Sequence, residues 1–362
     1  MTAAIRTDSG WSLVELLIAL LIALVISTAA LTVLGAHMGM ARTQPMAVDL
    51  QQRARGGAEV LYRDLQLAGA GPSYGPSPGP LHRALPPVVP RRMGLQGADG
   101  PTVARADAIT IMYVAATPAQ SALRQPLPAG GSTLFVEHGP QCPASDLLCA
   151  LATGASLVVF DRLGHFDFFT VTSIGVDSAQ VRSWQAGHSS YAYDAGASLS
   201  EAQWHTYYFD PTNRQLRHFD GYLTDIPVVD EVVGVTFEYE GDPLPPWAPK
   251  PPAGTANCLY DASETPWPGL ASLPAHDGSL AALPLSILSD GPWCGDGDNT
   301  FDVDLLRIRQ VRVTLRLQVG NDMMRGKSAD FAIAGKGTDR RQLLSDYVLR
   351  FTVAPRNMGW DH

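Results

Sequence analysis

The first 70 residues carry two hydrophobic patterns in succession. From Trp11 the chain is predominantly apolar, and the one Asp, Glu, Lys or Arg before Arg42 is Glu15. A bilayer-spanning helix needs about 20 apolar residues, so this run is long enough to cross a membrane. A carboxylate inside such a run costs about 2–3 kcal/mol at depth and is rarely kept without a use. We therefore predict a transmembrane helix over residues 11–41 and single out Glu15 as a functional residue.

Beyond this run, apolar residues recur every three or four positions, as on one face of an amphipathic helix. The recurring positions are Leu50, Ala54, Ala58, Leu61, Leu65 and Ala68. Charged residues, Arg63 and Asp64 among them, fall largely outside this pattern. We predict a stem helix over residues 42–69, kinked or interrupted at Pro45, because proline lacks the backbone N–H that a helix interior uses.

The middle of the chain changes to a β-type pattern. Residues 70–105 are dense in Gly and Pro and predict an irregular linker, and residues 106–240 contain short runs typical of strands. The turn sequence Asp210-Pro211-Thr212-Asn213 joins two of these runs as a hairpin. The predicted strands of this β-rich body are Ala108–Val114, Thr133–Glu137, Ser156–Phe160, Phe166–Ser173, Trp204–Phe209, Arg214–Phe219 and Val232–Tyr239.

The last third of the chain contains an irregular segment and then the clearest strands. Residues 241–303 break the strand rhythm with scattered Gly, Pro and Trp, and we predict a surface insertion held by a disulfide rather than by a core. In residues 304–357, alternation from Val311 to Val319 and from Tyr347 to Val353 predicts an antiparallel pair. The expected fold class is α+β, with a long N-terminal helix packed on an antiparallel sheet body.

Charge and cysteine content narrow the functional classes. The formal net charge of −9 over 362 residues excludes the overall basic surface that selects nucleic acid, so no general nucleic-acid binding is predicted. The four cysteines form no CxxC pair and lack histidines at zinc-ligand spacing. In an exported body they favour two disulfides. Sequence proximity suggests Cys142 with Cys149 and Cys258 with Cys294, but sequence alone leaves the pairing open.

The sequence contains none of the common catalytic fingerprints. It has no GxSxG, HExxH, P-loop or dinucleotide-binding motif, so we expect neither catalysis nor an organic cofactor. One acidic run places Asp296, Asp298, Asp302 and Asp304 close together, as oxygen ligands are spaced in calcium loops. It lacks the glycine and the final glutamate of an EF-hand. The alternatives are a calcium site and an acidic turn that leads into a strand at Leu305.

The N-terminal sequence GWSLVELL, residues 10–17, resembles the class III signal of type IV prepilins and pseudopilins. In that family Gly is followed by Phe or Met, then Ser or Thr, Leu, an apolar residue and Glu; Trp11 departs from the commoner Phe. The resemblance implies a leader over residues 1–10, cleavage after Gly10 by a prepilin peptidase, and methylation of the new N-terminus at Trp11. Cleavage before the apolar run, unlike that of a secretory signal, would keep the helix in the mature protein.

Glu15 would have a physical role in such a protein. The amine released at Trp11 is cationic, and in a filament of axially offset helices it can meet a neighbour's carboxylate in a medium of low dielectric constant. A complementary pair is tolerated there, whereas a single charge is costly. Glu15 would then set the axial register of assembly. The alternative is a carboxylate that snorkels to the headgroups around a plain membrane anchor.

Two further segments resemble PilW-type minor pilins and J-type minor pseudopilins: the stem ending LYRDLQLAG, residues 61–69, and the closing VLRFTVAPRN, residues 348–357. The resemblance implies a minor pilin of a type IV pilus, in the tip or priming complex that initiates filament assembly. Its partners would be other minor and major pilins, the prepilin peptidase and an inner-membrane assembly platform. The chain would be a single-pass inner-membrane protein with a periplasmic body, and later part of the pilus. Alternatives are a minor pseudopilin of a type II secretion system and a membrane-anchored periplasmic binding or enzymatic domain.

Overall fold

The computed structural model of the chain describes residues 12–142, 144–184, 191–275, 280–340 and 342–359. The chain divides into two compact units. One comprises the chain up to Gln52 together with Val319–Asp346, and the other comprises Arg53–Gln318 together with the chain from Tyr347. We call the second unit the body.

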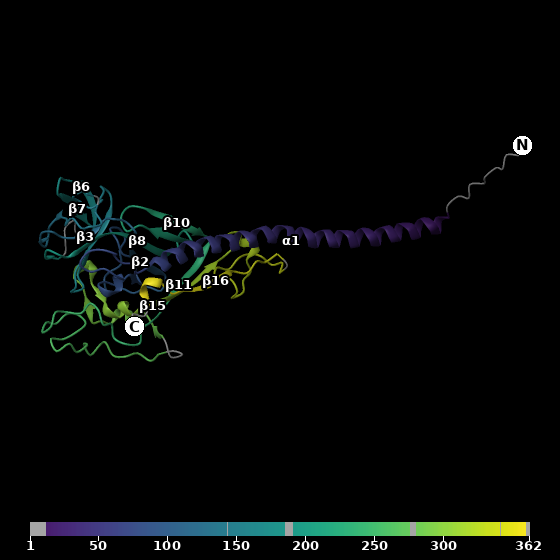
Figure 1. The fold of residues 1–362 in the computed structure, drawn as a ribbon. Coiled ribbons are helices and arrows are strands. Elements are labelled where there is room, and N and C mark those ends of the chain that lie inside the picture. The colour runs from purple at the N-terminus through teal and green to yellow at the C-terminus, as the bar shows by residue number, and fades with distance from the viewer. Residues whose placement is uncertain (1–11, 143, 185–190, 276–279, 341, 360–362) are drawn as a thin grey trace, which may run out of the picture. The chain divides into compact units, whose positions relative to one another are not determined.

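A single helix, α1 (Leu13–Leu67), contains both predicted helical segments (Figure 1). The helix continues through Pro45, so the predicted interruption at that residue is wrong, whereas the alternative, a kink there, stays a prediction. A proline removes one backbone hydrogen bond at a cost of about 3 kcal/mol, and the turns on either side retain theirs. The helix is closed by Gly69, whose φ of +78° is the left-handed conformation that glycine commonly adopts after a helix C-terminus.

The body contains a ten-stranded sheet whose strand pairings are antiparallel. Its main path is β1-β2-β8-β5-β6-β7-β4, while β3 and β9 also pair with β8, and β10 pairs with β9. The strands are β1 (Val88–Val89), β2 (Ala108–Val114), β3 (Gln120–Ala122), β4 (Thr133–Phe135), β5 (Ser156–Phe160), β6 (Phe166–Ile174), β7 (Ser178–Ser183), β8 (Ser198–Asp210), β9 (Gln215–Phe219) and β10 (Asp225–Asp230).

A second, four-stranded antiparallel sheet has the order β12-β11-β15-β16. These strands are β12 (Ala281–Leu283), β11 (Val232–Gly241), β15 (Ile308–Leu317) and β16 (Tyr347–Val353). Pairing of β15 with β16 confirms the predicted C-terminal antiparallel pair. With the long helix, the two sheets confirm the α+β class. The smaller elements are the two-stranded ribbon β13 (Trp293–Cys294) and β14 (Phe301–Asp302), and the 3-10 turns Leu81–Arg83, Ile287–Ser289, Gly297–Asn299, Val303–Arg307, Asp322–Met324 and Arg356–Met358.

The part of α1 that belongs to the body buries one face, as the apolar spacing predicted. Ala54, Leu61, Leu65 and Ala68 have no exposed surface. Asp64, which the pattern assigned to the polar residues, is the exception: it retains only 2% of its surface and lies on the buried face. A buried carboxylate needs hydrogen-bond partners, and those partners identify a candidate site described below.

The irregular segment 241–303 is more firmly integrated than predicted. The predicted disulfide between Cys258 and Cys294 is present, with the Cα atoms 5.1 Å apart. The segment also supplies a strand, β12, to the second sheet, and it buries apolar side chains at Leu259, Leu270, Leu288 and Phe301. The expectation that it is held by a disulfide rather than by a core is therefore wrong, because isolated apolar residues pack well without forming a periodic pattern.

Candidate functional site

The N-terminal turn of α1 carries the residue that the sequence singled out. Gly10 and Trp11, the predicted cleavage and methylation residues, lie outside the described residues, whereas Glu15 lies in the first helical turn. The Ser12 N–H donates to Glu15 Oε2 at 3.0 Å, and the Glu15 N–H donates to Ser12 Oγ at 3.2 Å. These reciprocal bonds form a capping box, which satisfies two N–H groups that a helix start leaves free.

Glu15 lies within an apolar helical segment of 22 residues, Leu13–Leu34, none of which is buried inside the protein. By length and composition this segment could cross a membrane. Two of its hydroxyls bond within the helix: Thr28 Oγ1 donates to the Leu24 carbonyl at 2.7 Å, and Thr32 Oγ1 donates to the Ala29 carbonyl at 2.7 Å. Hydrocarbon offers no partner to a free hydroxyl, so these bonds suit the helix to a lipid environment. The segment could be a membrane anchor or a signal sequence.

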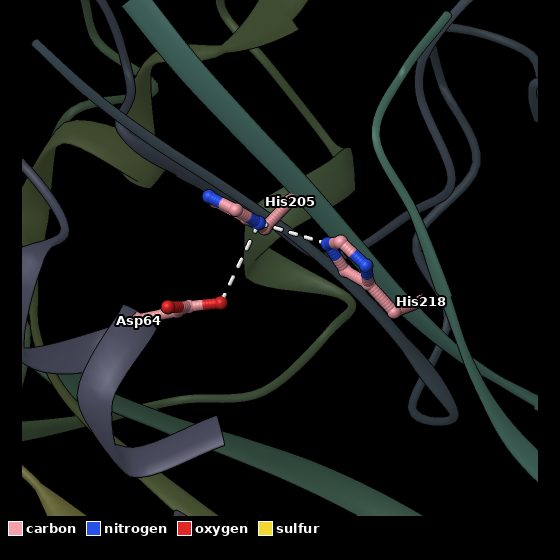
Figure 2. A group of neighbouring side chains, drawn as sticks. All are labelled: Asp64, His205 and His218. Atoms are coloured by element: carbon pink, nitrogen blue, oxygen red, sulfur yellow. Dashed lines mark hydrogen bonds and ion pairs between the residues drawn. The ribbon is translucent and has the colours of Figure 1, made fainter. Parts of the chain in front are cut away.

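The body contains a polar cluster formed by Asp64, His205 and His218, which the sequence analysis did not predict (Figure 2). Asp64 comes from α1, His205 from β8 and His218 from the neighbouring strand β9. His205 Nδ1 lies 2.8 Å from His218 Nε2 and 3.5 Å from Asp64 Oδ2. One ligand-type atom from each of the three residues thus falls within 4.8 Å of the others.

Two tyrosines hold this cluster in place. The Tyr207 hydroxyl donates to Asp64 Oδ2 at 2.5 Å, and the Tyr113 hydroxyl lies 3.1 Å from His205 Nε2. Burial raises the pKa of Tyr207, so this phenol keeps its proton and acts as a donor. The rings of Tyr113 and His205 stack at 5.5 Å between centroids, and those of His205 and His218 at 5.0 Å. The imidazoles are therefore fixed in orientation as well as in position.

Burial also determines the charge of the two histidines. Loss of solvent around His205 and His218 lowers the pKa of each below its ordinary value, and this effect outweighs the attraction of Asp64. Both imidazoles are consequently neutral at neutral pH. The cluster combines one carboxylate with two neutral imidazoles, a set that can bind a metal ion or share protons.

Weak sequence signals for this cluster were present. Asp64 lies three residues after Leu61 and four before Ala68, which is the spacing of the buried face. His205 and His218 flank the predicted hairpin turn, and their strands do pair, with Tyr207 opposite His218. What the sequence could not show is that this part of the hairpin lies against the helix.

The acidic run is only partly brought together. Asp302 and Asp304 group with Asp290, which was not in the predicted set, while Asp296 and Asp298 are not part of that group. Asp302 Oδ2 accepts the Gly291 N–H at 2.6 Å, and Asp302 Oδ1 accepts the Asp304 N–H at 2.8 Å. Calcium binding by the original four residues therefore remains a prediction.

The Asp304 carboxyl already has a basic neighbour. Its Oδ1 lies 2.5 Å from Nε of the buried Arg307 guanidinium, and burial raises the pKa of Asp304 to about 7. A bound cation would have to compete with this arginine, so this contact favours the acidic-turn alternative for this stretch.

Both predicted disulfides are present. Cys142 bonds to Cys149 with the Cα atoms 4.5 Å apart, and Cys258 bonds to Cys294. The first lies in the core cluster that includes Leu134, Val159 and Phe169. Such bonds persist in oxidising compartments, so the disulfides agree with an exported body.

Comparison with known proteins adds no relationship to this picture. No protein-family model matches the sequence, and no curated protein shows significant similarity to it.

Proposed function

We propose that the chain is a minor pilin of a type IV pilus, of the PilW type, and acts in the tip or priming complex at which filament assembly begins. The observation that carries this proposal is the make-up of α1. One uninterrupted helix begins with a carboxylate in its first turn, continues as an exposed apolar run and ends as part of an antiparallel body. A helix of this kind can leave the bilayer and bury the same apolar side chains against neighbouring helices.

The proposed mechanism is assembly, not catalysis. A prepilin peptidase cleaves after Gly10, the amine of Trp11 is methylated, and the chain stays in the inner membrane with its body in the periplasm. An assembly platform then inserts it beside other minor and major pilins. Contact between apolar helices supplies cohesion, and Glu15 selects the axial offset at which its carboxylate meets a neighbour's N-terminal amine.

The capping box is compatible with this role. A carboxylate has about four lone-pair positions, and Glu15 uses one of them for the Ser12 N–H. Enough acceptor capacity remains for the amine of an adjacent subunit. The capping bond also fixes the carboxylate at the helix start, which reduces the conformational entropy lost when the amine arrives.

The test separates the charge of Glu15 from its capping role. Glu15→Gln keeps an oxygen that can accept the Ser12 N–H but removes the charge, whereas Ser12→Ala keeps the charge and weakens the cap by about 1 kcal/mol. We expect Glu15→Gln to abolish incorporation into filaments and Ser12→Ala to preserve it. Incorporation is measured by recovery of the subunit in sheared pili.

Mass spectrometry of the mature N-terminus accompanies each variant. The proposal requires cleavage after Gly10 and a methylated Trp11 in the parent and in Glu15→Gln. Normal incorporation of Glu15→Gln would refute the register role. A parent chain that still begins at Met1 would refute the pilin assignment as a whole.

A further inference from the structure

We propose that Asp64, His205 and His218 form a binding site for a divalent transition metal ion, most suitably Zn²⁺. The bound ion would link the C-terminal part of α1 to strands β8 and β9. The donor atoms are close to the required geometry. Zinc bonds to nitrogen or oxygen measure about 2.0–2.1 Å, so tetrahedral ligand atoms lie about 3.3 Å apart. The distances from His205 Nδ1 are 2.8 Å to His218 Nε2 and 3.5 Å to Asp64 Oδ2. The ligand atoms of Asp64 and His218 lie within 4.8 Å of each other, so a bound ion would draw this third pair together.

The outer contacts present the correct atoms to the metal. The Tyr113 hydroxyl lies 3.1 Å from His205 Nε2. The other ring nitrogen, Nδ1, faces Asp64 and His218 (Figure 2). The Tyr207 hydroxyl bonds to the Asp64 carboxylate and orients it. Metal-binding residues generally depend on such second hydrogen bonds to hold their orientation. The arrangement therefore has both the ligands and the supports of a metal site.

The charge balance favours a cation. Asp64 is buried, and a buried carboxylate is costly unless a positive charge or hydrogen-bond donors lie beside it. The Asp64 carboxylate also pairs with Arg63, whose Nε lies 3.5 Å from Asp64 Oδ1. The Arg63 side chain is 71% exposed, so solvent screens much of its charge. Oδ2 accepts the Tyr207 hydroxyl and lies 3.5 Å from His205 Nδ1, and a carboxylate oxygen has a second lone pair with which to bind a metal.

The ligand types select the metal. Two imidazole nitrogens and one carboxylate oxygen suit Zn²⁺ and its neighbours Cu²⁺ and Ni²⁺, whereas Ca²⁺ and Mg²⁺ prefer oxygen ligands throughout. Three protein ligands leave a fourth position for water. Access is available because the His205 side chain is 17% exposed and His218 is half-buried.

A bound ion would join elements that are distant in sequence. Asp64 and His218 are separated by about 150 residues of chain, and one belongs to the helix while the other belongs to the sheet. Without metal, the same three side chains can form a hydrogen-bonded trio only, with one proton shared through His205 Nδ1. The experiment distinguishes these two states.

The binding test uses the full chain in detergent, without a polyhistidine tag and stripped of metal by a chelator. We expect titration with Zn²⁺ to saturate at one tight ion per chain and to raise the thermal unfolding temperature. Replacement by Co²⁺ should produce the visible absorption of a tetrahedral centre. X-ray absorption of the zinc form should show two imidazole nitrogens among light ligands and no sulfur.

Variants assign the ion to this cluster. His218→Gln should weaken Zn²⁺ binding by more than about 100-fold, and Tyr113→Phe, which removes only an outer contact, by about 10-fold to 100-fold. The matched control is His165→Gln, since His165 also pairs with a carboxylate, Asp161, at 2.9 Å, but outside the cluster. It should bind Zn²⁺ as the parent does.

Two results would overturn the proposal. One is Zn²⁺ binding that is equally tight in the parent and in His218→Gln. The other is a parent chain that shows no bound zinc at micromolar concentration and no imidazole coordination in its absorption spectrum; the cluster would then be a hydrogen-bonded trio only. The spectroscopic result applies to the parent chain, so it decides the question even where a variant fails to fold.

Discussion

Two adjacent glycines of α1, Gly56 and Gly57, should respond differently to substitution by alanine. Gly56 has open space around it, and a methyl group added there would meet no atom within 4 Å. A methyl group added at Gly57 would overlap Cγ2 of Val229 in β10 and lie 3.7 Å from Cδ2 of Leu315 in β15. Gly57 is thus the point at which the helix backbone comes close to side chains from both sheets.

Because the two glycines lie in the same helix, the effect of helix propensity is the same at both, and any difference in stability between the two variants reports the packing around Gly57. Replacing glycine by alanine in a helix interior stabilises it by about 1 kcal/mol at either position. At Gly57 this gain is opposed by overpacking, which costs about 1–3 kcal/mol when buried neighbours must move. Val229 is only 4% exposed and has little room to withdraw. We expect Gly56→Ala to stabilise the body by about 1 kcal/mol, and Gly57→Ala to be less stable than Gly56→Ala by about 1–3 kcal/mol.

The assay is urea unfolding of the full chain in detergent, followed by the fluorescence of the buried tryptophans Trp184 and Trp204. A double-mutant cycle then tests the contact directly. Val229→Ala opens the space that the new methyl group needs, so it should cost less stability in the Gly57→Ala background than in the parent. If Gly57→Ala stabilises the chain as much as Gly56→Ala, the helix can move away from the sheets and the close approach is not required.

Three further outcomes can be measured on the same chain. The disulfide between Cys258 and Cys294 spans a sequence separation of 36, and the one between Cys142 and Cys149 spans 7. By loop entropy, replacing both cysteines of a pair with serine should lower the free energy of unfolding by about 4 kcal/mol for the first disulfide and about 2.5 kcal/mol for the second. Equal losses in urea unfolding would contradict this ranking. Burial raises the pKa of Asp302 to about 6, so the native state binds more protons than the unfolded state between about pH 4 and pH 6. Stability contributed by the protonated carboxyl is therefore lost as pH rises through this window, by about 3 kcal/mol; Asp302→Asn should flatten the slope of unfolding free energy against pH, and an unchanged slope would show that another group titrates. Removing Zn²⁺ with a chelator should lower the unfolding temperature of the parent but leave that of His218→Gln unchanged.

The local sequence explains which strands were predicted correctly: β2 alternates at Ile109, Ile111 and Tyr113, and β5 contains a short apolar run, residues 157–160. β2 and β5 begin and end at the predicted residues, and the predicted hairpin joins β8 to β9, with Asp210 Oδ1 accepting the Thr212 N–H in the turn. β8 is longer than predicted because its first half, Ser198–Gln203, is mostly polar and becomes a strand by pairing with β2, β3 and β5. Such pairing is not encoded in the local sequence. β10 was missed because Pro227 lies at a bulge that disturbs its register with β9.

The candidate site was harder to predict than the fold, for a different reason. Glu15 and the cysteines are conspicuous because their residue types are unusual in their surroundings. Asp64 is an ordinary polar residue in an amphipathic helix, and His205 is an ordinary residue in a strand. Their chemistry arises from a contact between the helix and the sheet, and a pattern along one element contains no information about the element that it meets.

Gly57 and Asp64 determine how the C-terminal part of α1 packs within the body, one by setting the distance of the helix from the sheets and the other by setting its rotation. They are seven residues apart, which is close to two helical turns, so they share one face. Gly57 allows the backbone to approach the sheets, which sets the distance. Asp64 must reach Tyr207 and His205, and a rotation of the helix by one residue would bury the exposed Arg63 in its place. If the helix rotated, the buried carboxylate would lose these partners. The resulting loss of folding free energy would be far larger than the loss caused by moving an apolar side chain in the same way. The polar residue therefore fixes the rotation of the helix, which the apolar residues around it define less sharply.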